Sequence, residues 1–198
     1  TLLSIINQTY QNFELIIVND GSTDNTAKII EKFIKENSRF EIKYFFKKNS
    51  GLANSRNFAI KKTKFDWIAM IDHDDIWFKN KLEYQSKEIN ENSNKKLFFS
   101  DFNIFNNKTK RSRFKIFQEK DKFITSKLDF TAYNGFINLI LCGCFIGSST
   151  VIFDKRVMKQ IGSFDTRYRF LTDYIFFLNL SKYFEIHCTN TILAEWRS

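Results

Sequence analysis

Along the first half of the chain, apolar and polar positions come in alternating blocks that predict strands followed by helices. Residues 13–18 form a nearly continuous apolar run, which is typical of a buried parallel strand. Turn residues follow at 19–22, and the apolar positions of residues 23–36 then have helical spacing. The same pattern predicts helices at residues 1–9, 52–62 and 78–90 and strands at residues 41–46 and 66–71. This alternation favours an α/β fold, with a mostly parallel sheet, right-handed crossovers and flanking helices.

The second half of the chain has a more mixed pattern. It predicts strands at residues 97–104, 114–117, 148–153 and 185–193, and helices at residues 155–161 and 172–183. Neither an internal repeat nor a flexible Gly/Ser linker interrupts the chain, and 198 residues suit one domain. We therefore expect residues 1–198 to form a single domain.

The formal net charge of +9 favours anionic partners such as nucleotide phosphates, an acidic membrane surface or nucleic acid. The main basic block, residues 108–115, is interpreted as a solvated loop or hairpin, with contact to an anionic lipid or acceptor as the alternative. The remaining basic residues are scattered and no recognition motif accompanies them, so no nucleic-acid partner is expected.

Cysteine usage and hydropathy indicate a cytoplasmic protein. The three cysteines are an odd number without metal-ligand spacing, which indicates reduced thiols rather than a zinc site. No apolar run approaches the roughly 18 residues of a membrane span, and no signal peptide opens the chain. Together with the positive charge, these features predict a cytoplasmic location with peripheral contact at the inner face of the cell membrane.

Three carboxylates, Asp72, Asp74 and Asp75, directly follow the predicted strand at residues 66–71. Like charges this close repel one another unless a positive group lies among them. Hard cations such as Mg²⁺ or Mn²⁺ take oxygen ligands, and Mg²⁺ is usually held by one or two carboxylates together with substrate phosphates. This acidic run is therefore interpreted either as a polar turn or as a divalent-metal site at the end of a strand, where open α/β sheets bind ligands.

A second candidate site follows the strand at residues 13–18. Asp20 ends this strand, where a carboxylate can accept hydrogen bonds from a base or ribose. Gly21 permits close approach of the backbone, and the free N–H groups of a helix start can face a nucleotide. The alternative is that Ser22 and Asp24 only cap the following helix, and both interpretations can hold together.

Two isolated residues complete the set of candidates. Arg56 lies in a predicted helix after a glycine turn, where it can pair with a diphosphate or a carboxylate, or simply be a surface residue. Asp173 lies at the start of a predicted helix, either as a first-turn carboxylate favoured by the helix dipole or as a general base.

Four segments, in this order, resemble those of the inverting nucleotide-sugar glycosyltransferases of family 2, which have the GT-A fold. They are Ser-Ile-x-x-Gln-Thr-Tyr, Ile-Ile-Val-Asn-Asp-Gly-Ser-Thr-Asp-Asn-Thr, Gly-Leu-Ala-x-Ser-Arg-Asn and Ile-Asp-His-Asp-Asp-Ile-Trp, at residues 4–10, 16–26, 51–57 and 71–77. Residues 148–174 resemble the acceptor side of the family, so the resemblance covers nearly the whole chain. It implies that residues 1–104 bind the nucleotide sugar and that residues 105–198 form the acceptor side.

On the donor side, the resemblance implies that Asp20, with Gly21 and Ser22, contacts the nucleoside and that Arg56 lies near the nucleotide. Asp72-His73-Asp74 would be the family's Asp-x-Asp motif. Asp74 would then bind a divalent metal, Mg²⁺ or Mn²⁺, and Asp72 would point toward the ribose or the metal.

On the acceptor side, Asp173 would be the catalytic base, in a Thr-Asp pair where the family usually has Glu-Asp. The implied reaction is transfer of a sugar from a nucleoside-diphosphate sugar, with a UDP-sugar as the expected donor, to a glycan or lipid-linked acceptor. Such enzymes build surface polysaccharide, lipopolysaccharide or glycoprotein glycans. Two other hypotheses stay open: a nucleotidyltransferase, and a catalytically silent protein that binds nucleotide or stabilises a complex.

Family members begin with an apolar strand ahead of the helix that residues 1–9 resemble, and this chain has no such strand. A missing central strand leaves unpaired backbone on its neighbours. We therefore predict that the chain alone binds donor nucleotide poorly. Calorimetric titration with and without an added N-terminal strand measures this, and equal affinity for the nucleotide would contradict it.

Overall fold

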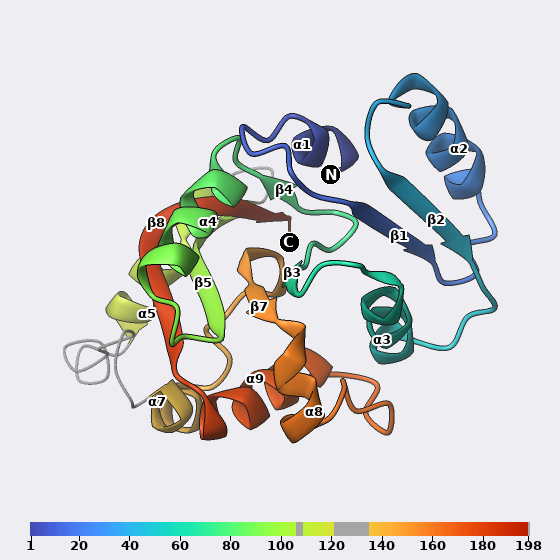
Figure 1. The fold of residues 1–198 in the computed structure, drawn as a ribbon. Helices are drawn as coiled ribbons and strands as arrows, with labels where there is room; N and C mark the ends of the chain where they lie inside the picture. The colour runs from blue at the N-terminus through green and yellow to red at the C-terminus, as the bar shows by residue number, and fades with distance from the viewer. Residues whose placement is uncertain (106–108, 121–134, 198) are drawn as a thin grey trace.

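The computed structural model describes residues 1–105, 109–120 and 135–197 and has the predicted α/β architecture, arranged around two sheets (Figure 1). The smaller sheet pairs β1 (Leu15–Asn19) with β2 (Ile42–Phe46) in parallel. Helix α2 (Thr26–Glu36) connects these strands, and α3 (Leu52–Lys62) follows β2 and contacts β1. This half follows the predicted strand–helix alternation.

The larger sheet has the strand order β3-β7-β5-β8-β4, and β6 pairs with β5. Its strands are β3 (Trp67–Ala69), β4 (Ile76–Trp77), β5 (Leu97–Phe105), β6 (Lys110–Ser112), β7 (Ile152–Asp154) and β8 (Ile186–Arg197). Only β5 and β8 run parallel here, whereas the other pairs are antiparallel, so this sheet is mixed rather than mostly parallel. Because β3 pairs with β7, the acidic run from the first half lies beside strands of the second half.

Helices cover the sheets and bury the core between them. The remaining helices are α1 (Leu2–Ile6), α4 (Lys81–Glu91), α5 (Arg113–Lys120), α7 (Gly135–Cys142), α8 (Met158–Ile161) and α9 (Thr172–Tyr183), with 3-10 turns η1 (Ser148–Thr150) and η2 (Lys155–Val157). Helix α9 contacts both α7 and α8 along one edge of the molecule (Figure 1). Its Phe176, Phe177 and Leu180 are fully buried and belong to one cluster with Phe153 of β7. The middle of α9 is therefore packed against the sheet through these apolar side chains.

The predicted strand at residues 114–117 is wrong, because these residues belong to α5. Two side-chain oxygens cap the start of this helix: Asp101 Oδ1 accepts from the backbone N–H of Phe114 at 3.1 Å, and Ser112 Oγ accepts from that of Lys115 at 3.1 Å. Such capping satisfies N–H groups that a helix start otherwise leaves free. Asp101 is distant in sequence, so the local apolar pattern carries no sign of it.

The predicted strand at residues 148–153 is also wrong in its first half. Residues Ser148–Thr150 form the turn η1, and the strand begins only at Ile152. Thr150 closes this turn with two hydrogen bonds to the carbonyl of Gly147, from its N–H at 2.9 Å and from its Oγ1 at 2.7 Å. A hydroxyl that bonds to nearby backbone competes with a strand ladder in this way. The sequence pattern also gave no prediction for the short strands β4 and β6.

Beneath this turn, Lys81 is fully buried at 0% exposure. Its Nζ donates to Gln85 Oε1 at 2.6 Å and lies 4.4 Å from the centre of the Trp77 ring. Gln85 Nε2 in turn donates to the carbonyl of Thr150 at 2.9 Å. Burial lowers the pKa of Lys81 to about 7, because desolvation disfavours its charged form.

This burial predicts a pH dependence of stability. The folded pKa of Lys81 lies below its unfolded value of 10.5, so the unfolded chain binds more protons between these values and stability rises with pH. Between about pH 7.5 and 9.5, the free energy of unfolding of wild type minus that of Lys81→Met should rise by about 1.4 kcal/mol per pH unit. Denaturant unfolding across this range measures it. The exposed Lys87→Met is the control, and a flat difference for Lys81→Met would contradict the prediction.

Candidate active site

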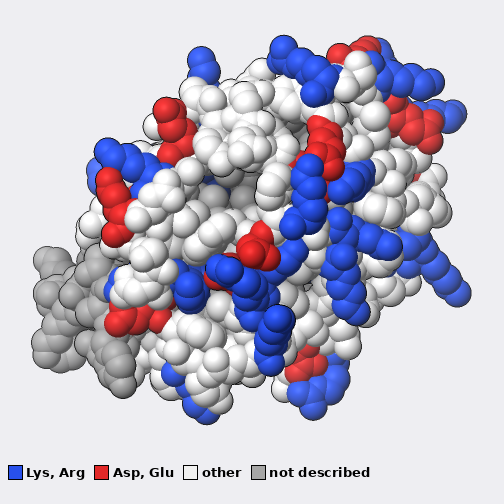
Figure 2. All heavy atoms as spheres, viewed as in Figure 1, with Lys and Arg blue, Asp and Glu red and all other residues white. Residues whose placement is uncertain are grey.

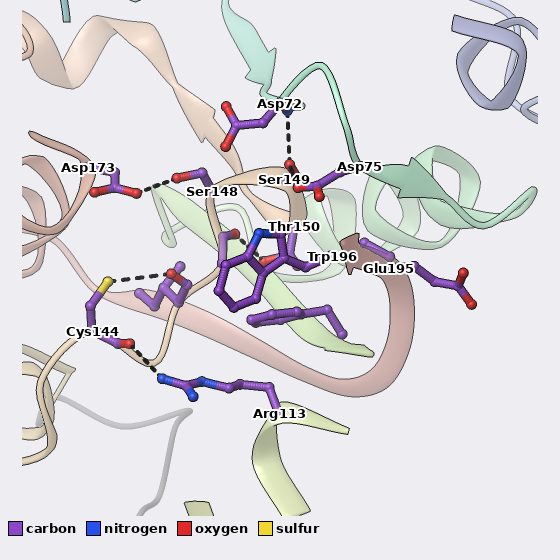
Figure 3. Close-up of a pocket in the computed structure, with 14 residues that line it drawn as sticks. Asp72, Asp75, Arg113, Cys144, Ser148, Ser149, Thr150, Asp173, Glu195 and Trp196 are labelled. Atoms are coloured by element: carbon purple, nitrogen blue, oxygen red, sulfur yellow. Dashed lines mark hydrogen bonds between the residues drawn. The ribbon is translucent and has the colours of Figure 1, made fainter. Parts of the chain in front are cut away.

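A pocket of about 240 Å³ lies where the acidic run, the turn η1, the first turn of α9 and the end of β8 converge (Figure 3). Asp72 and Asp75 line it from the first half of the chain, and Asp173 lines it from the second. The structure thus brings two of the candidate residues, Asp72 and Asp173, into one pocket although about a hundred positions separate them.

The turn η1 connects the two sides of this pocket. Ser148 Oγ donates to Asp173 Oδ2 at 2.6 Å, and Ser149 Oγ donates to Asp75 Oδ2 (Figure 3). Ser149 Oγ also accepts from the backbone N–H of Asp72 at 2.9 Å. The carbonyl of Ser149 is held from below by Trp77 Nε1 at 2.6 Å. Two adjacent serines therefore fix the acidic run and the α9 carboxylate relative to one another.

Asp173 lies in the first turn of α9, as the sequence predicted. Besides the bond from Ser148, its Oδ1 accepts from the N–H of Tyr174 at 2.8 Å. The residue that precedes the helix, Leu171, has a left-handed backbone with φ 59, which is uncommon for a residue other than glycine. Strain of this kind often marks functional segments, and here it turns the chain into α9 just before Asp173.

The three carboxylates of the acidic run have different surroundings. Asp75 is only 3% exposed, and burial raises its pKa, to which the charges of Asp72 and Asp74 add. Asp75 also accepts bonds from Ser149 and the N–H of Arg197. Its burial and these hydrogen bonds indicate that Asp75 has a structural role in the turn, whereas Asp74 is exposed.

Arg56 supplies the positive group that the acidic run requires. Its Nη2 contacts Asp72 Oδ1 at 3.0 Å, and its guanidinium lies 5.6 Å from the centre of the Phe164 ring. The sequence offered a diphosphate or a carboxylate as the partner of Arg56, and in the structure Arg56 pairs with a carboxylate. Its Nη1 group is buried and remains without a hydrogen bond to the described residues.

Asp20, Gly21 and Ser22 are not among the residues that line this pocket. The carboxylate of Asp20 accepts from Lys47 Nζ and from the N–H groups of Ser50 at 3.0 Å and Gly51 at 2.9 Å. Burial by itself would raise the pKa of Asp20, but these donors outweigh it and hold the pKa below its usual value. Asp20 thus fixes the loop between β2 and α3 against the end of β1.

Glycine is required at position 21 for two reasons. Its φ of 83 is left-handed, and a Cβ there would lie 2.8 Å from the backbone nitrogen of Asn49. The close approach of this loop therefore depends on a residue without a side chain. Ser22 is exposed and does not cap α2; its N–H donates to Asn19 Oδ1 at 2.8 Å, and Asp24 Oδ1 accepts from the N–H of Thr26 at 2.9 Å.

The carboxylates of the acidic run suit a hard divalent cation that is bound together with a ligand, rather than a metal held by protein side chains alone. Within residues 1–105, 109–120 and 135–197, no group of three or more His, Cys, Asp or Glu side chains is placed to hold a metal. Exposed Asp74 and half-buried Asp72 offer carboxylate oxygens, and Mg²⁺ is usually bound by one or two such groups plus substrate phosphates. These residues fit a metal that arrives with a phosphate-bearing ligand.

Basic side chains are dispersed over the face drawn in Figure 2, where a few acidic side chains lie near the centre. The pocket residues that sequence reasoning did not predict include Ser148, Ser149 and Arg113. The polar run at residues 147–150 was a signal for the serines, because four small or hydroxyl residues are unusual at the start of a buried strand. Arg113 was included in the basic block at residues 108–115, but nothing in the sequence distinguished it from its neighbours.

Comparison with known proteins places the chain in a family. The model of glycosyl transferase family 2 matches residues 1–157. A relative from Escherichia coli, the UDP-Glc:alpha-D-GlcNAc-diphosphoundecaprenol beta-1,3-glucosyltransferase WfaP, is 36% identical over the whole chain and 70% of its own length. An uncharacterized glycosyltransferase of Rickettsia bellii is 50% identical over 90 residues, which are 46% of this chain and 13% of that protein.

Solved structures show the same fold. Staphylococcus aureus TarS 1-349 in complex with UDP matches all of the chain and 55% of its own, with a TM-score of 0.71 and 20% identity. The mannosyltransferase PcManGT from Pyrobaculum calidifontis, in complex with GDP-Man and Mn²⁺, matches 98% of the chain and 51% of its own, with a TM-score of 0.73 and 13% identity. The chain thus spans about half the length of these solved proteins. Its fold is GT-A, and the chain belongs to glycosyl transferase family 2.

Proposed function

We propose that this chain is the catalytic part of a metal-dependent inverting glycosyltransferase that moves a sugar from a nucleoside-diphosphate sugar to a glycan or lipid-linked acceptor. The observation that carries this proposal is the turn η1, whose Ser148 and Ser149 hold Asp173, Asp72 and Asp75 at one pocket. Asp74 is exposed next to this group and is not among the lining residues. A base and a phosphate-metal anchor at one pocket are what a single-displacement sugar transfer needs.

In this mechanism, Asp173 is the general base. An acceptor hydroxyl is a poor nucleophile, so a carboxylate within hydrogen-bond reach takes its proton as the new bond forms. Both oxygens of Asp173 already have donors, Ser148 Oγ and the N–H of Tyr174, which fix the orientation of the carboxylate. The hydroxyl attacks the anomeric carbon from the side opposite the leaving diphosphate, and this single displacement inverts the anomeric centre.

Asp74 and Asp72 are proposed to hold a divalent metal, Mg²⁺ or Mn²⁺, together with the donor diphosphate. A metal held there would supply positive charge to offset the negative charge that the leaving diphosphate gains. Arg56 is proposed to position Asp72 through their 3.0 Å contact. Asp20, with Gly21 and Ser22, is proposed to contact the nucleoside of the donor, and Asp20 also holds the adjoining loop through the N–H groups of Ser50 and Gly51.

A UDP-sugar is the proposed donor, and the synthesis of a surface polysaccharide is the proposed context. WfaP is named for UDP-Glc as donor and a diphosphoundecaprenol-linked acceptor, and TarS is solved with UDP. None of the described helices has the length and apolar character to cross a bilayer. With the net charge of +9, a cytoplasmic location with peripheral contact at the inner face of the membrane remains our proposal.

The proposal predicts different effects for the base and the metal ligand. Asp173→Asn should lower sugar transfer by about 10²- to 10⁴-fold, because the amide cannot accept the proton, while binding of Mn²⁺ and UDP is kept. Asp74→Ala should weaken both transfer and binding. Release of UDP from a panel of UDP-sugars measures turnover, and calorimetry measures binding.

The exposed carboxylate Asp66, which pairs with Arg156 at 3.5 Å, provides the matched control Asp66→Asn. This variant should behave as wild type in both assays. Turnover that survives in Asp173→Asn would show that the base is misassigned, and nucleotide binding without any turnover in wild type would favour the catalytically silent alternative.

A further prediction concerns Ser148, which acts through Asp173 rather than on the substrate. Ser148→Ala removes a hydrogen bond to a charged group and should lower kcat by about tenfold or more, with little change in the affinity for Mn²⁺ and UDP. The exposed Ser163→Ala is the matched control. An unchanged kcat in Ser148→Ala would mean that the α9 carboxylate does not depend on the turn.

A further inference from the structure

Arg113 has surroundings unlike those of the other basic residues in its block. Lys110 and Arg111 lie on β6 and form ion pairs with Glu195 and Glu119. Arg113 is the first residue of α5, is half-buried, and lines the pocket (Figure 3). Residues 110–112 of the basic block thus pair with β5 in a hairpin, as one of the sequence interpretations had it. Residues 113–115 begin α5 instead, and Arg113 lines the pocket.

The partly buried guanidinium of Arg113 has few favourable contacts that offset the cost of removing it from water. Its Nη2 donates to the carbonyl of Cys144 at a long 3.5 Å, and its central carbon lies 4.2 Å from the centre of the Phe117 ring. Among the described residues no carboxylate forms an ion pair with it, and burial lowers its pKa. Arginine stays charged in proteins, so this is a partly desolvated cation that faces a pocket.

The location of Arg113 indicates which ligand it meets. In Figure 3, Arg113 enters the pocket from the end opposite Asp72, and it contacts Cys144. Arg113, Cys144 and the proposed base Asp173 all line this one pocket. Burial, with the charge of Asp173 as a smaller cause, raises the pKa of the Cys144 thiol to about 12. A ligand group bound by Arg113 therefore lies in the pocket that Asp173 also lines, at the end away from Asp72.

We propose that Arg113 binds an anionic group of the acceptor, a phosphate or a carboxylate, and thereby selects acceptors that carry negative charge close to the reacting sugar. The assignment to the acceptor rests on the proposed function, since it takes Asp173 as the base that meets the acceptor hydroxyl. The planar guanidinium has two parallel donors that match both anions in a bidentate arrangement. Trp196, which lines the same pocket and is 43% exposed, offers an aromatic face beside this group.

The test compares matched pairs of probes that differ in charge. The pairs are N-acetylglucosamine 1-phosphate against methyl N-acetylglucosaminide, and glucuronate against glucose. Binding is titrated by NMR in the presence of saturating Mn²⁺ and UDP, so that an anion cannot bind in the donor site. Wild type is compared with Arg113→Met, which keeps length and loses charge, with Arg113→Lys, which keeps charge and loses the fork, and with the control Arg111→Met.

Wild type and Arg111→Met should prefer at least one charged probe by about tenfold, the value expected for a charge-assisted hydrogen bond. Arg113→Met should lose this preference and Arg113→Lys should keep only part of it. Equal binding of charged and neutral probes by wild type, or a preference that survives in Arg113→Met, would overturn the proposal. So would a preference that disappears when Mn²⁺ and UDP are added.

The experiment also separates this proposal from misfolding of a variant and from failure of the proposed transferase function. If thermal melting shows that Arg113→Met does not fold, Arg113→Lys decides the question, and an unchanged affinity for the phosphate probe would overturn the proposal. If the charged probes bind through Arg113 but wild type releases no UDP from any UDP-sugar, the transferase function fails while the anion site stands.

Discussion

The hydrogen bonds on the two sides of the turn η1 are the constraint on which the pocket depends. Ser148 reaches the carboxylate of Asp173 on α9, and Ser149 reaches Asp75 and the backbone of Asp72 after β3. The turn is itself fixed from below by Trp77 and by Gln85, which donate to its carbonyls at 2.6 and 2.9 Å. Buried polar networks of this kind specify one geometry when every member has its partners. A shift of the turn would therefore move the proposed base and the proposed metal ligands together.

The mixed sheet explains how this arrangement arises. Strand β7 pairs with both β3 and β5, so the turn that precedes β7 lies at the end of β3, where the acidic run begins. Parallel pairing of β7 with β3 would instead have put the turn before β7 at the start of β3, away from the acidic run. β1 pairs only with β2 and β3 only with β7 among the described strands, so each has one edge without a described partner. The expectation of a further strand in the donor half remains a prediction.

Much of the fold follows from local patterns, whereas the site follows from contacts between distant residues. The helices at residues 52–62 and 172–183 and the strand at 42–46 have the predicted type and nearly the predicted bounds, because their apolar spacing agrees with the face that they bury. The helix at Arg113–Lys120 was missed because Asp101, from another strand, caps it. The sequence predicted Asp173 at a helix start, and it offered a diphosphate or a carboxylate as the partner of Arg56. It gave no sign that Ser148 lies beneath Asp173 or that Asp20 bonds to Ser50 and Gly51, since those contacts depend on the tertiary arrangement.

The central claim is that the acidic run and Asp173 serve one reaction at one pocket. A crystal structure of the protein with Mn²⁺ and UDP tests it most directly. We expect the metal to lie between the diphosphate and the carboxylate of Asp74, with Asp72 beside it. Asp173 should keep its bond from Ser148 and face the open side of the pocket. A nucleotide bound away from residues 72–75, or a metal without contact to Asp72 or Asp74, would contradict the claim.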